Sequence, residues 1–140
     1  MLEMVKEINR TASFNRWAGF EVTQAAAGEA ELRMLWHSDD MGQYAGYLHA
    51  GLIAALLDTA CGFAAATVSG RVLTSHFSVN CLAPATGRHF VPHGRVVKAG
   101  RKQVFTTAEL YAVSDTAAGK SEKLVATGNA ILVPVQTTSP

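Results

Sequence analysis

The sequence predicts an α+β domain in which an antiparallel sheet wraps around one long, apolar helix. The first reason is the stretch of residues 49–67, the most apolar of the chain, in which Asp58 is the single carboxylate. A helix that is hydrophobic on nearly every side must be buried. The second reason is that four segments rich in β-branched and aromatic residues follow it, each bounded by Gly, Pro or Asp. Residues 1–140 are expected to form one domain, with 136–140 as a flexible tail.

The first half of the chain predicts two helices and a hairpin. Residues 1–15 place charged and aliphatic side chains at helical spacing, and they lack the apolar run of a signal peptide, so we expect a cytoplasmic protein. Residues 19–37 alternate polar and apolar side chains around an Ala-Gly turn, which predicts a hairpin. The apolar helix is expected to begin near Gly51 and to end around Ser69 and Gly70.

The second half predicts strands at residues 72–82, 89–100, 102–115 and 123–135. One apolar helix facing several amphipathic strands is an α+β arrangement. A membrane span is a poorer interpretation of the helix, because Asp58 lies at its centre and no second span exists to shelter the charge.

The composition excludes several classes of function. The net charge is +1, with 49% hydrophobic and 16% charged residues, so neither disorder nor a basic nucleic-acid surface is expected. Cys61 and Cys81 lie far apart in apolar surroundings, which favours two reduced core thiols. Histidines 37, 76, 89 and 93 show no ligand spacing, so no metal site is expected.

Asp58 is the residue that the fold alone does not explain, because a buried carboxylate needs a partner. On a helix its neighbours are all small: Ala54, Ala55, Cys61 and Gly62. The bulky side chains Ile53, Leu56, Leu57 and Phe63 are expected elsewhere on the helix. Asp58 is therefore expected in a shallow groove that admits a substrate or a closely approaching strand.

The start of the same helix offers the complementary chemistry. Free backbone N–H groups at Ala50 and Gly51 are suited to holding a developing oxyanion. His49 and Asp58 are separated by nine residues, about 13.5 Å and 900° of helix, which places them on opposite faces. They can cooperate only if a symmetric dimer brings the helix start of one subunit to the acid of the other.

These residues also resemble a known family. Gln43 precedes His49 by six positions, "HAG" follows, and Asp58 lies nine residues past the histidine. This pattern resembles the motif of hotdog-fold acyl-CoA thioesterases of the phenylacetate-degradation type, in the 4-hydroxybenzoyl-CoA thioesterase superfamily. The stretches "NCLAPATG" and "VKAGRKQVF" are similar to further family patterns, so the resemblance covers residues 16–135.

The resemblance implies hydrolysis of an acyl-CoA to a free acid and CoA, without a metal or other cofactor. It also implies that the homodimer required by the geometry pairs into a homotetramer. The charge balance and the central Asp58 leave neither nucleic acid nor a membrane as an expected partner. Asp58 would be the base or nucleophile, and the Ala50 amide of the other subunit would polarise the thioester carbonyl. Gln43 would orient the acid or the attacking water.

The same resemblance assigns further residues. His49 would support the start of the helix, and Thr74 lies where relatives carry a hydroxyl close to the acid. Gly100, Arg101 and Lys102 lie where basic residues commonly meet the CoA phosphates. The departure from the family is Ala50, which replaces a glycine and would be strained if that position needs φ above zero.

Plainer interpretations remain open for each residue. Asp58 could be neutralised by Thr59 or by a strand residue, and His49 could simply cap the helix. Gln43 and Thr74 could be ordinary loop and strand residues, and Arg101 and Lys102 could be solvated turn charges. Aromatic residues at strand spacing, namely Phe77, Phe105 and Tyr111, could pack in the core, pack at an interface or line an acyl pocket.

Two alternative functions also remain. One is a non-catalytic acyl-CoA binding module that keeps the groove but has lost turnover through the replacement of glycine by Ala50. The other is an acyl-thioester hydratase of the same fold, although the Pro-Gly-rich helix start typical of such dehydratases is missing from the sequence.

Overall fold

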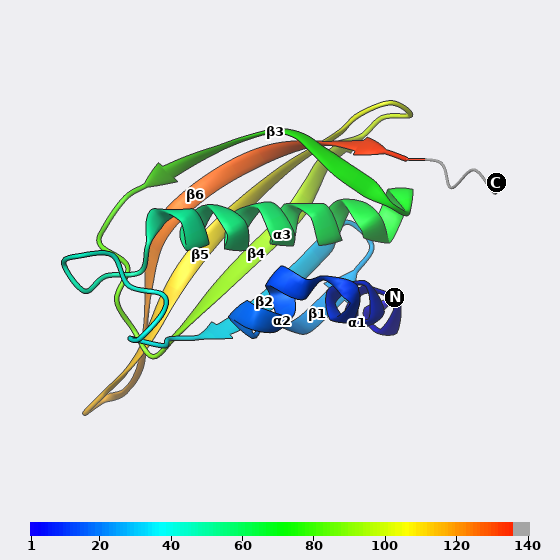
Figure 1. Cartoon of the computed structure of the whole chain (residues 1–140). Helices are drawn as coiled ribbons and strands as arrows, with labels where there is room; N and C mark the ends of the chain where they lie inside the picture. Colours follow the sequence, from blue (N-terminus) through cyan, green and yellow to red (C-terminus); the bar gives the residue numbers. More distant parts are fainter. Residues whose placement is uncertain (136–140) are drawn as a thin grey trace.

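A computed structural model describes residues 1–135, in which a curved antiparallel sheet holds one long helix, α3, against its concave face (Figure 1). The elements are α1 (Leu2–Thr11), α2 (Ser13–Ala18), β1 (Glu21–Ala26), β2 (Glu29–Leu35), α3 (Ala50–Ser69), β3 (Val72–Cys81), β4 (His89–Ala99), β5 (Val104–Thr116) and β6 (Gly119–Pro134). The α+β class predicted from the sequence is confirmed. The tail expected at 136–140 lies outside the described residues.

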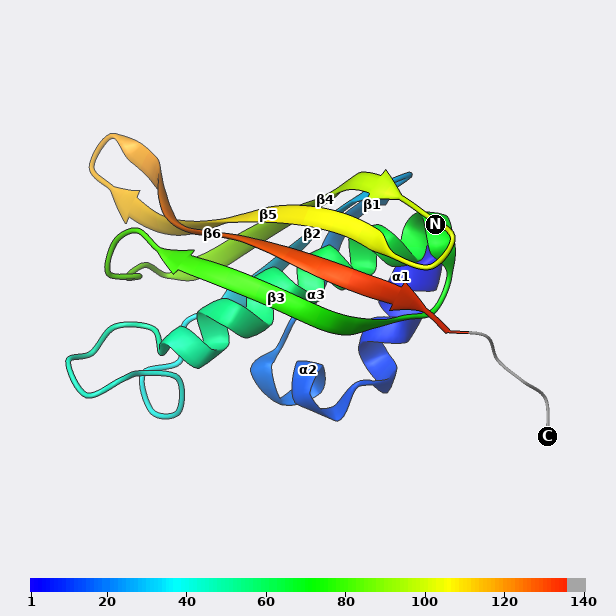
Figure 2. The same cartoon turned by 90° about the horizontal axis from the view of Figure 1, so that it is seen from above.

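The order of the strands decides which edges of the sheet are open. The order is β1-β2-β4-β5-β6-β3, and each neighbouring pair is antiparallel. The chain leaves α3 and crosses to the far edge, where β3 pairs only with β6 in the described structure. Figure 2 shows α3 lying along the sheet with β3 at its margin. The segment that follows the apolar helix is therefore an edge strand.

The helix α3 contributes more buried residues to the core than any other element. Ten of its residues are buried. At Gly94 of β4 an added Cβ would lie 2.5 Å from the Ala60 carbonyl oxygen, so only glycine allows the strand to approach α3 this closely. α3 is long and apolar enough to cross a membrane, yet 56% of its most apolar window is buried inside the protein.

The N-terminal segment forms two helices, so the expectation of one helix over residues 1–15 is wrong. Ala12 is extended, with φ −88° and ψ 114°, and separates α1 from α2. The Asn15 side-chain amide donates to Asn9 Oδ1 at 3.0 Å, and the Asn9 amide donates to the Phe20 carbonyl at 2.8 Å. These long-range hydrogen bonds fold the chain back at a position that has neither Gly nor Pro.

The expectation of two core thiols is half right. Cys61 on α3 is buried, whereas Cys81 is exposed. Cys81 is the last residue of β3, which lies at the edge of the sheet. An apolar sequence environment did not reveal that its strand lies at an edge.

Candidate active site

Asp58 lies midway along α3, half-buried, and is held by a residue of the edge strand. The Thr74 hydroxyl donates a hydrogen bond to Asp58 Oδ1 at 2.7 Å. Burial raises the pKa of the Asp58 carboxyl above its usual 3.8, and the bond from Thr74 lowers it in part. Thr74 therefore lies next to the acid, as predicted. Among residues 1–135, Asp58 Oδ2 has no hydrogen-bond donor and is available for another partner.

A β-bulge at Ser75 aims the Thr74 side chain at Asp58. Thr74 pairs with the buried Leu132 of β6, and the register then shifts by one residue before His76. Thr74 and Phe77 therefore both face the helix side, although strict alternation would place residues three apart on opposite faces.

His49 caps the first turn of α3. It is the N-cap, and its Nδ1 accepts the Gly51 N–H at 2.8 Å. An added Cβ at Gly51 would lie 3.0 Å from the same nitrogen, so the absence of a side chain at Gly51 leaves room for the imidazole. The expectation that Gly51 offers a free N–H is wrong, because its proton is used by the cap.

The His49 cap bonds the Gly51 N–H and does not use the Ala50 N–H. Among residues 1–135 no acceptor for it is found. Every positive φ angle in this range belongs to a glycine, so Ala50 is not strained in place of the family's glycine. The helix start therefore presents one backbone donor together with the positive end of the helix dipole.

Gln43 is directed into its own loop. Its Oε1 accepts hydrogen bonds from the N–H groups of Ala45 at 2.5 Å and Tyr47 at 3.2 Å. The oxygen therefore stabilises the loop that leads into α3. Within one chain the structure brings Gln43 to neither Asp58 nor Thr74, and it leaves Asp58 and Ala50 eight residues apart, about 12 Å along α3.

A cavity of about 430 Å³ opens beside Asp58. Its lining combines residues in or next to α1, α2, α3, β3 and β6: Glu7, Ile8, Thr11, Asn15, Asp58, Thr59, Gly62, Phe63, Ala66, Arg71, Val72, Leu73, Thr74, Leu132 and Val135. The groove predicted around Asp58 and Gly62 is present. Phe63 forms part of its wall, which corrects the expectation that the bulky side chains lie elsewhere.

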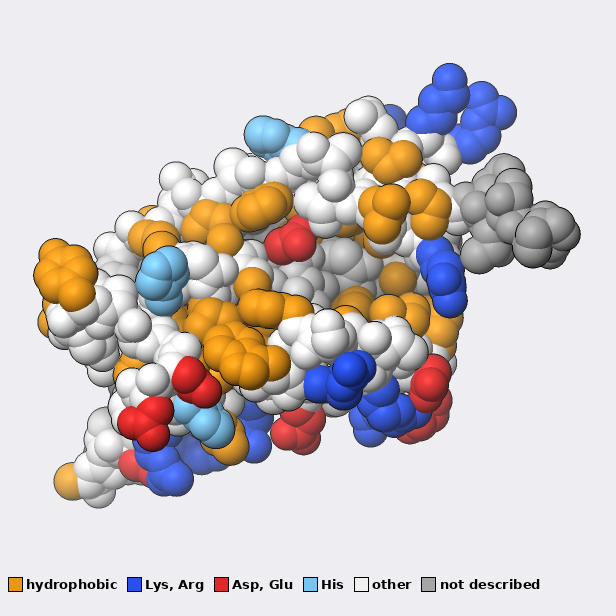
Figure 3. Space-filling view, viewed as in Figure 1, with side chains coloured by type: hydrophobic (Ala, Val, Ile, Leu, Met, Phe, Trp, Pro, Cys, Tyr) orange, Lys and Arg blue, Asp and Glu red, His pale blue; other side chains and the backbone are white. Residues whose placement is uncertain are grey.

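The helix α1 contributes part of the wall of this cavity. Ile8 and Thr11 lie three residues apart and so share one face of the helix. The amphipathic pattern of α1 indicated a buried face, but the sequence could not say which part of the protein it would cover. In Figure 3, hydrophobic side chains gather on this face of the molecule between α3 and the N-terminal helices.

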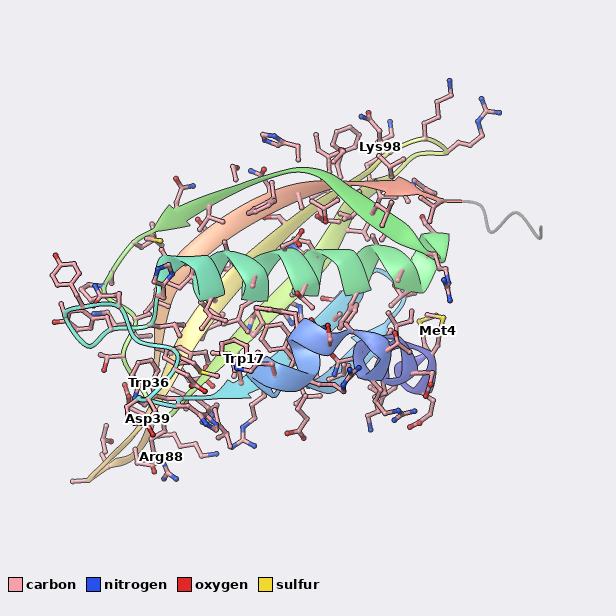
Figure 4. All side chains as sticks on the ribbon, in the orientation of Figure 1. Met4, Trp17, Trp36, Asp39, Arg88 and Lys98 are labelled. Atoms are coloured by element: carbon pink, nitrogen blue, oxygen red, sulfur yellow. The ribbon has the colours of Figure 1, made fainter. Side chains whose placement is uncertain are left out.

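A second cavity, of about 390 Å³, lies at the start of α3. Phe14 and Trp17 of α2 line it together with His49, Gly51 and Leu52. The two aromatic rings are 5.7 Å apart and both are exposed. Figure 4 shows Trp17 between α2 and the first half of α3.

The basic turn lies at the other end of the molecule. The Gly100 N–H donates to the Gln103 carbonyl at 2.8 Å between β4 and β5, and Arg101 and Lys102 are exposed there. Figure 4 places Lys98 at the same edge. Val104 pairs with Leu132, which pairs with Thr74, so the turn begins two strands, about 10 Å, from the hydroxyl that holds Asp58.

Comparisons with known proteins agree with this arrangement. The family model described as "Thioesterase superfamily" matches residues 45–118. A thioesterase family protein from Silicibacter pomeroyi is 35% identical, covers 92% of this chain and 93% of its own, and superposes with a TM-score of 0.86. Zebrafish thioesterase superfamily member 2 is 26% identical, with coverage of 96% and 99% and a TM-score of 0.79.

No curated protein matches the sequence. Among the described residues no grouping of His, Cys, Asp and Glu could hold a metal ion. A carboxylate at a cavity, a helix start with one unpaired N–H, the six-stranded sheet around α3 and the matches above lead to one assignment. The chain belongs to the thioesterase superfamily and has its hotdog fold.

Proposed function

We propose that this protein hydrolyses acyl-CoA thioesters, with Asp58 acting on water and the Ala50 N–H of the partner subunit holding the oxyanion. The observation that carries the proposal is the half-buried carboxylate of Asp58, oriented by Thr74 and open to a cavity. A structural acid would be expected to satisfy both oxygens internally, whereas Asp58 has one hydrogen bond among the described residues.

The edge strand β3 supports a homodimer. Six consecutive residues from Leu73 to Ser78 are exposed, and the Leu73 and Phe77 side chains are 64% and 46% accessible. A long, exposed edge strand is a ready template for pairing with another strand. Antiparallel pairing of two β3 strands about a two-fold axis would extend the sheet and place both α3 helices on one face.

The chemistry follows from these groups. Asp58 Oδ2 takes a proton from water, and the water oxygen forms a bond to the thioester carbonyl carbon. The carbonyl oxygen becomes an oxyanion that accepts the Ala50 N–H of the partner subunit at the positive end of its α3. The C–S bond then breaks, the proton returns from Asp58 to the CoA sulfur, and the free acid leaves. A raised pKa suits a base that must ionise near neutral pH and return its proton.

The nucleotide part of CoA is proposed to lie toward Arg101 and Lys102. Neither side chain has a carboxylate within ion-pair distance among the described residues. Guanidinium and ammonium groups bind phosphates through charge-assisted hydrogen bonds. We further propose that the dimers pair into a tetramer and that the protein works in the cytoplasm.

The sharpest test removes the two proposed groups separately. Ala50→Pro deletes only the N–H, because proline is tolerated at the first position of a helix and the preceding residue, His49, already has ψ 136°. Release of free thiol from a panel of acyl-CoAs is expected to fall about a hundredfold or more in Ala50→Pro and in Asp58→Asn. Glu122→Gln, an exposed carboxylate on β6, is the control and should match wild type.

Mixing the two inactive variants tests the shared site. Denaturing and refolding equal amounts together gives half heterodimers, each with one intact site out of two, so about a quarter of the wild-type activity should return. If the site were built within one chain, no activity would return. Absence of turnover on every thioester by the wild-type dimer would reject hydrolysis and leave an acyl-CoA binding module.

A further inference from the structure

The cavity beside Asp58 has the form of a track along one stripe of α3. Asp58, Gly62 and Ala66 follow one another at four-residue intervals and all line it. Successive positions of this kind lie one above the other on a helix, with a rise of about 6 Å per step. The stripe therefore extends about 12 Å from the carboxylate, along the groove between α3 and the first residues of β3.

Gly62 keeps the middle of this track open. An added Cβ there would have no heavy atom within 4 Å, which is unlike the tightly packed Gly94 on the opposite side of α3. Glycine costs a helix interior stability, and nothing in the fold requires its small size at this position. The space above Gly62 belongs to the cavity and is bordered by apolar residues, namely Ile8, Phe63, Val72 and Leu132.

The far end of the track is polar and exposed. Arg71, which follows the C-terminal end of α3, lines the cavity at that end and is exposed. Glu7 and Thr11 of α1 are further exposed polar residues of the lining, and Glu7 is paired with Arg10. An apolar group that reaches this end has left the apolar walls and meets water. The apolar part of the track is therefore of limited length and is not closed by a bulky side chain.

We propose that this track binds the acyl group as an extended, unbranched chain of about eight to ten carbons, and that Gly62 determines the chain length. The proposal rests on the hydrolysis proposed above and names its substrate class. An extended chain advances about 1.2 Å per bond, so 12 Å accommodates about ten bonds. A cavity of about 150 Å³ is enough for benzene, so one ring would fill only part of 430 Å³.

The experiment compares acyl-CoAs from two to sixteen carbons on wild type, Gly62→Ala and Gly62→Leu. In wild type each added methylene should raise kcat/KM about threefold to fourfold, with a plateau near ten carbons, where the chain reaches the polar end. Gly62→Leu blocks the track one helical turn from Asp58. Its plateau should fall to about four or five carbons, with activity on the two-carbon substrate retained, and Gly62→Ala should lie between.

Two control variants separate the track from other effects. Val68→Leu adds bulk on an exposed part of α3 that does not line the cavity, and it should keep the wild-type profile. Trp17→Ala opens the second cavity. If the chain length at which kcat/KM levels off changes in Trp17→Ala but not in Gly62→Leu, the acyl chain lies at the second cavity and the proposal is overturned. Size-exclusion chromatography verifies that each variant keeps the oligomeric state of wild type.

A binding measurement separates this proposal from hydrolysis itself. S-alkyl-CoA thioethers cannot be hydrolysed, and their dissociation constants can be measured by calorimetry on the same variants. Affinity that rises with chain length in wild type and is lost beyond five carbons in Gly62→Leu supports the track even if no thioester is cleaved. Affinity that is independent of chain length overturns the track even if hydrolysis is observed.

Discussion

The Thr74 hydroxyl joins the edge strand to the core helix by donating a 2.7 Å hydrogen bond to Asp58 Oδ1. Because this bond stabilises the ionised carboxyl, it opposes the rise in the Asp58 pKa that burial causes. One hydroxyl thereby ties the ionisation of the acid to the position of β3.

Thr74→Val is expected to raise the Asp58 pKa further. The acidic limb of the pH profile of kcat/KM should move to higher pH, so activity on that limb should fall relative to the alkaline plateau. Thr74→Ser keeps the hydroxyl and should keep the wild-type limb. A limb that stays in place in Thr74→Val would show that the bond does not control the base.

Asp58→Asn is expected to stabilise the fold at neutral pH, in addition to the loss of turnover described above. The folded pKa of Asp58 lies above the unfolded value, so the carboxyl costs no stability below about pH 3.8 and costs more as pH rises through the folded pKa. Thermal unfolding should show a melting temperature about 2–5 °C higher at pH 8, with the difference gone near pH 3.5. Asp115→Asn, an exposed acid paired with Arg88, should bring no gain at pH 8.

Two glycine-to-alanine changes in α3 are expected to act in opposite directions. Gly51→Ala places its Cβ 3.0 Å from His49 Nδ1, displaces the cap and should cost about 1 kcal/mol in the free energy of unfolding. Gly62→Ala meets no neighbour and should gain up to about 1 kcal/mol from helix propensity. Urea unfolding measures both. If both variants changed the free energy of unfolding in the same direction, the role assigned to the His49 cap would be contradicted.

Phe77→Glu is expected to separate the dimer and to inactivate it. Phe77 faces the helix side of β3 and is exposed in the single chain, so a charge there would be buried in the proposed interface. Light scattering should show monomers, and circular dichroism should show a retained fold. Phe105→Glu, on the outer face of β5, should leave the dimer and its activity intact. An active Phe77→Glu monomer would refute the shared site.

Arg101→Ala and Lys102→Ala are expected to weaken CoA binding without affecting the chemical step. KM should rise about tenfold for the double variant, with kcat little changed, because the charges act on phosphates remote from the thioester. Acyl-pantetheine, which lacks the nucleotide phosphates, serves as the control substrate and should respond equally in wild type and variant. Steady-state kinetics at low and high salt make this comparison.

Much of the fold could be predicted from the sequence because it depends on local patterns. The near-continuous apolar run around Asp58 predicted α3, and glycine at position 70 marked its end, where φ is +71°. The expectations that were wrong concern features that depend on contacts between residues distant in the sequence. The break at Ala12 comes from hydrogen bonds between Asn9, Asn15 and Phe20, and no local signal announces them.

In the candidate site, too, local features could be predicted from the sequence and three-dimensional ones could not. The sequence predicted a groove at Asp58 and a donor at Ala50. It could not show that His49 Nδ1 would accept a hydrogen bond from the Gly51 N–H, because the orientation of the imidazole ring depends on three-dimensional geometry. It could not separate Cys61 from Cys81 either, since exposure of the latter follows from the place of β3 in the sheet.

The bulge at Ser75 gives β3 an unusual tolerance for a change in length. Thr74 and Phe77 share a face only because one extra residue lies between them. Deleting Ser75 would leave both on the helix side, in ordinary alternation, whereas deleting a residue from the regular part of β3 after Phe77 would exchange the faces of every residue beyond it. An alignment of this family that opens a one-residue gap at Ser75 would therefore keep the same side chains at the site.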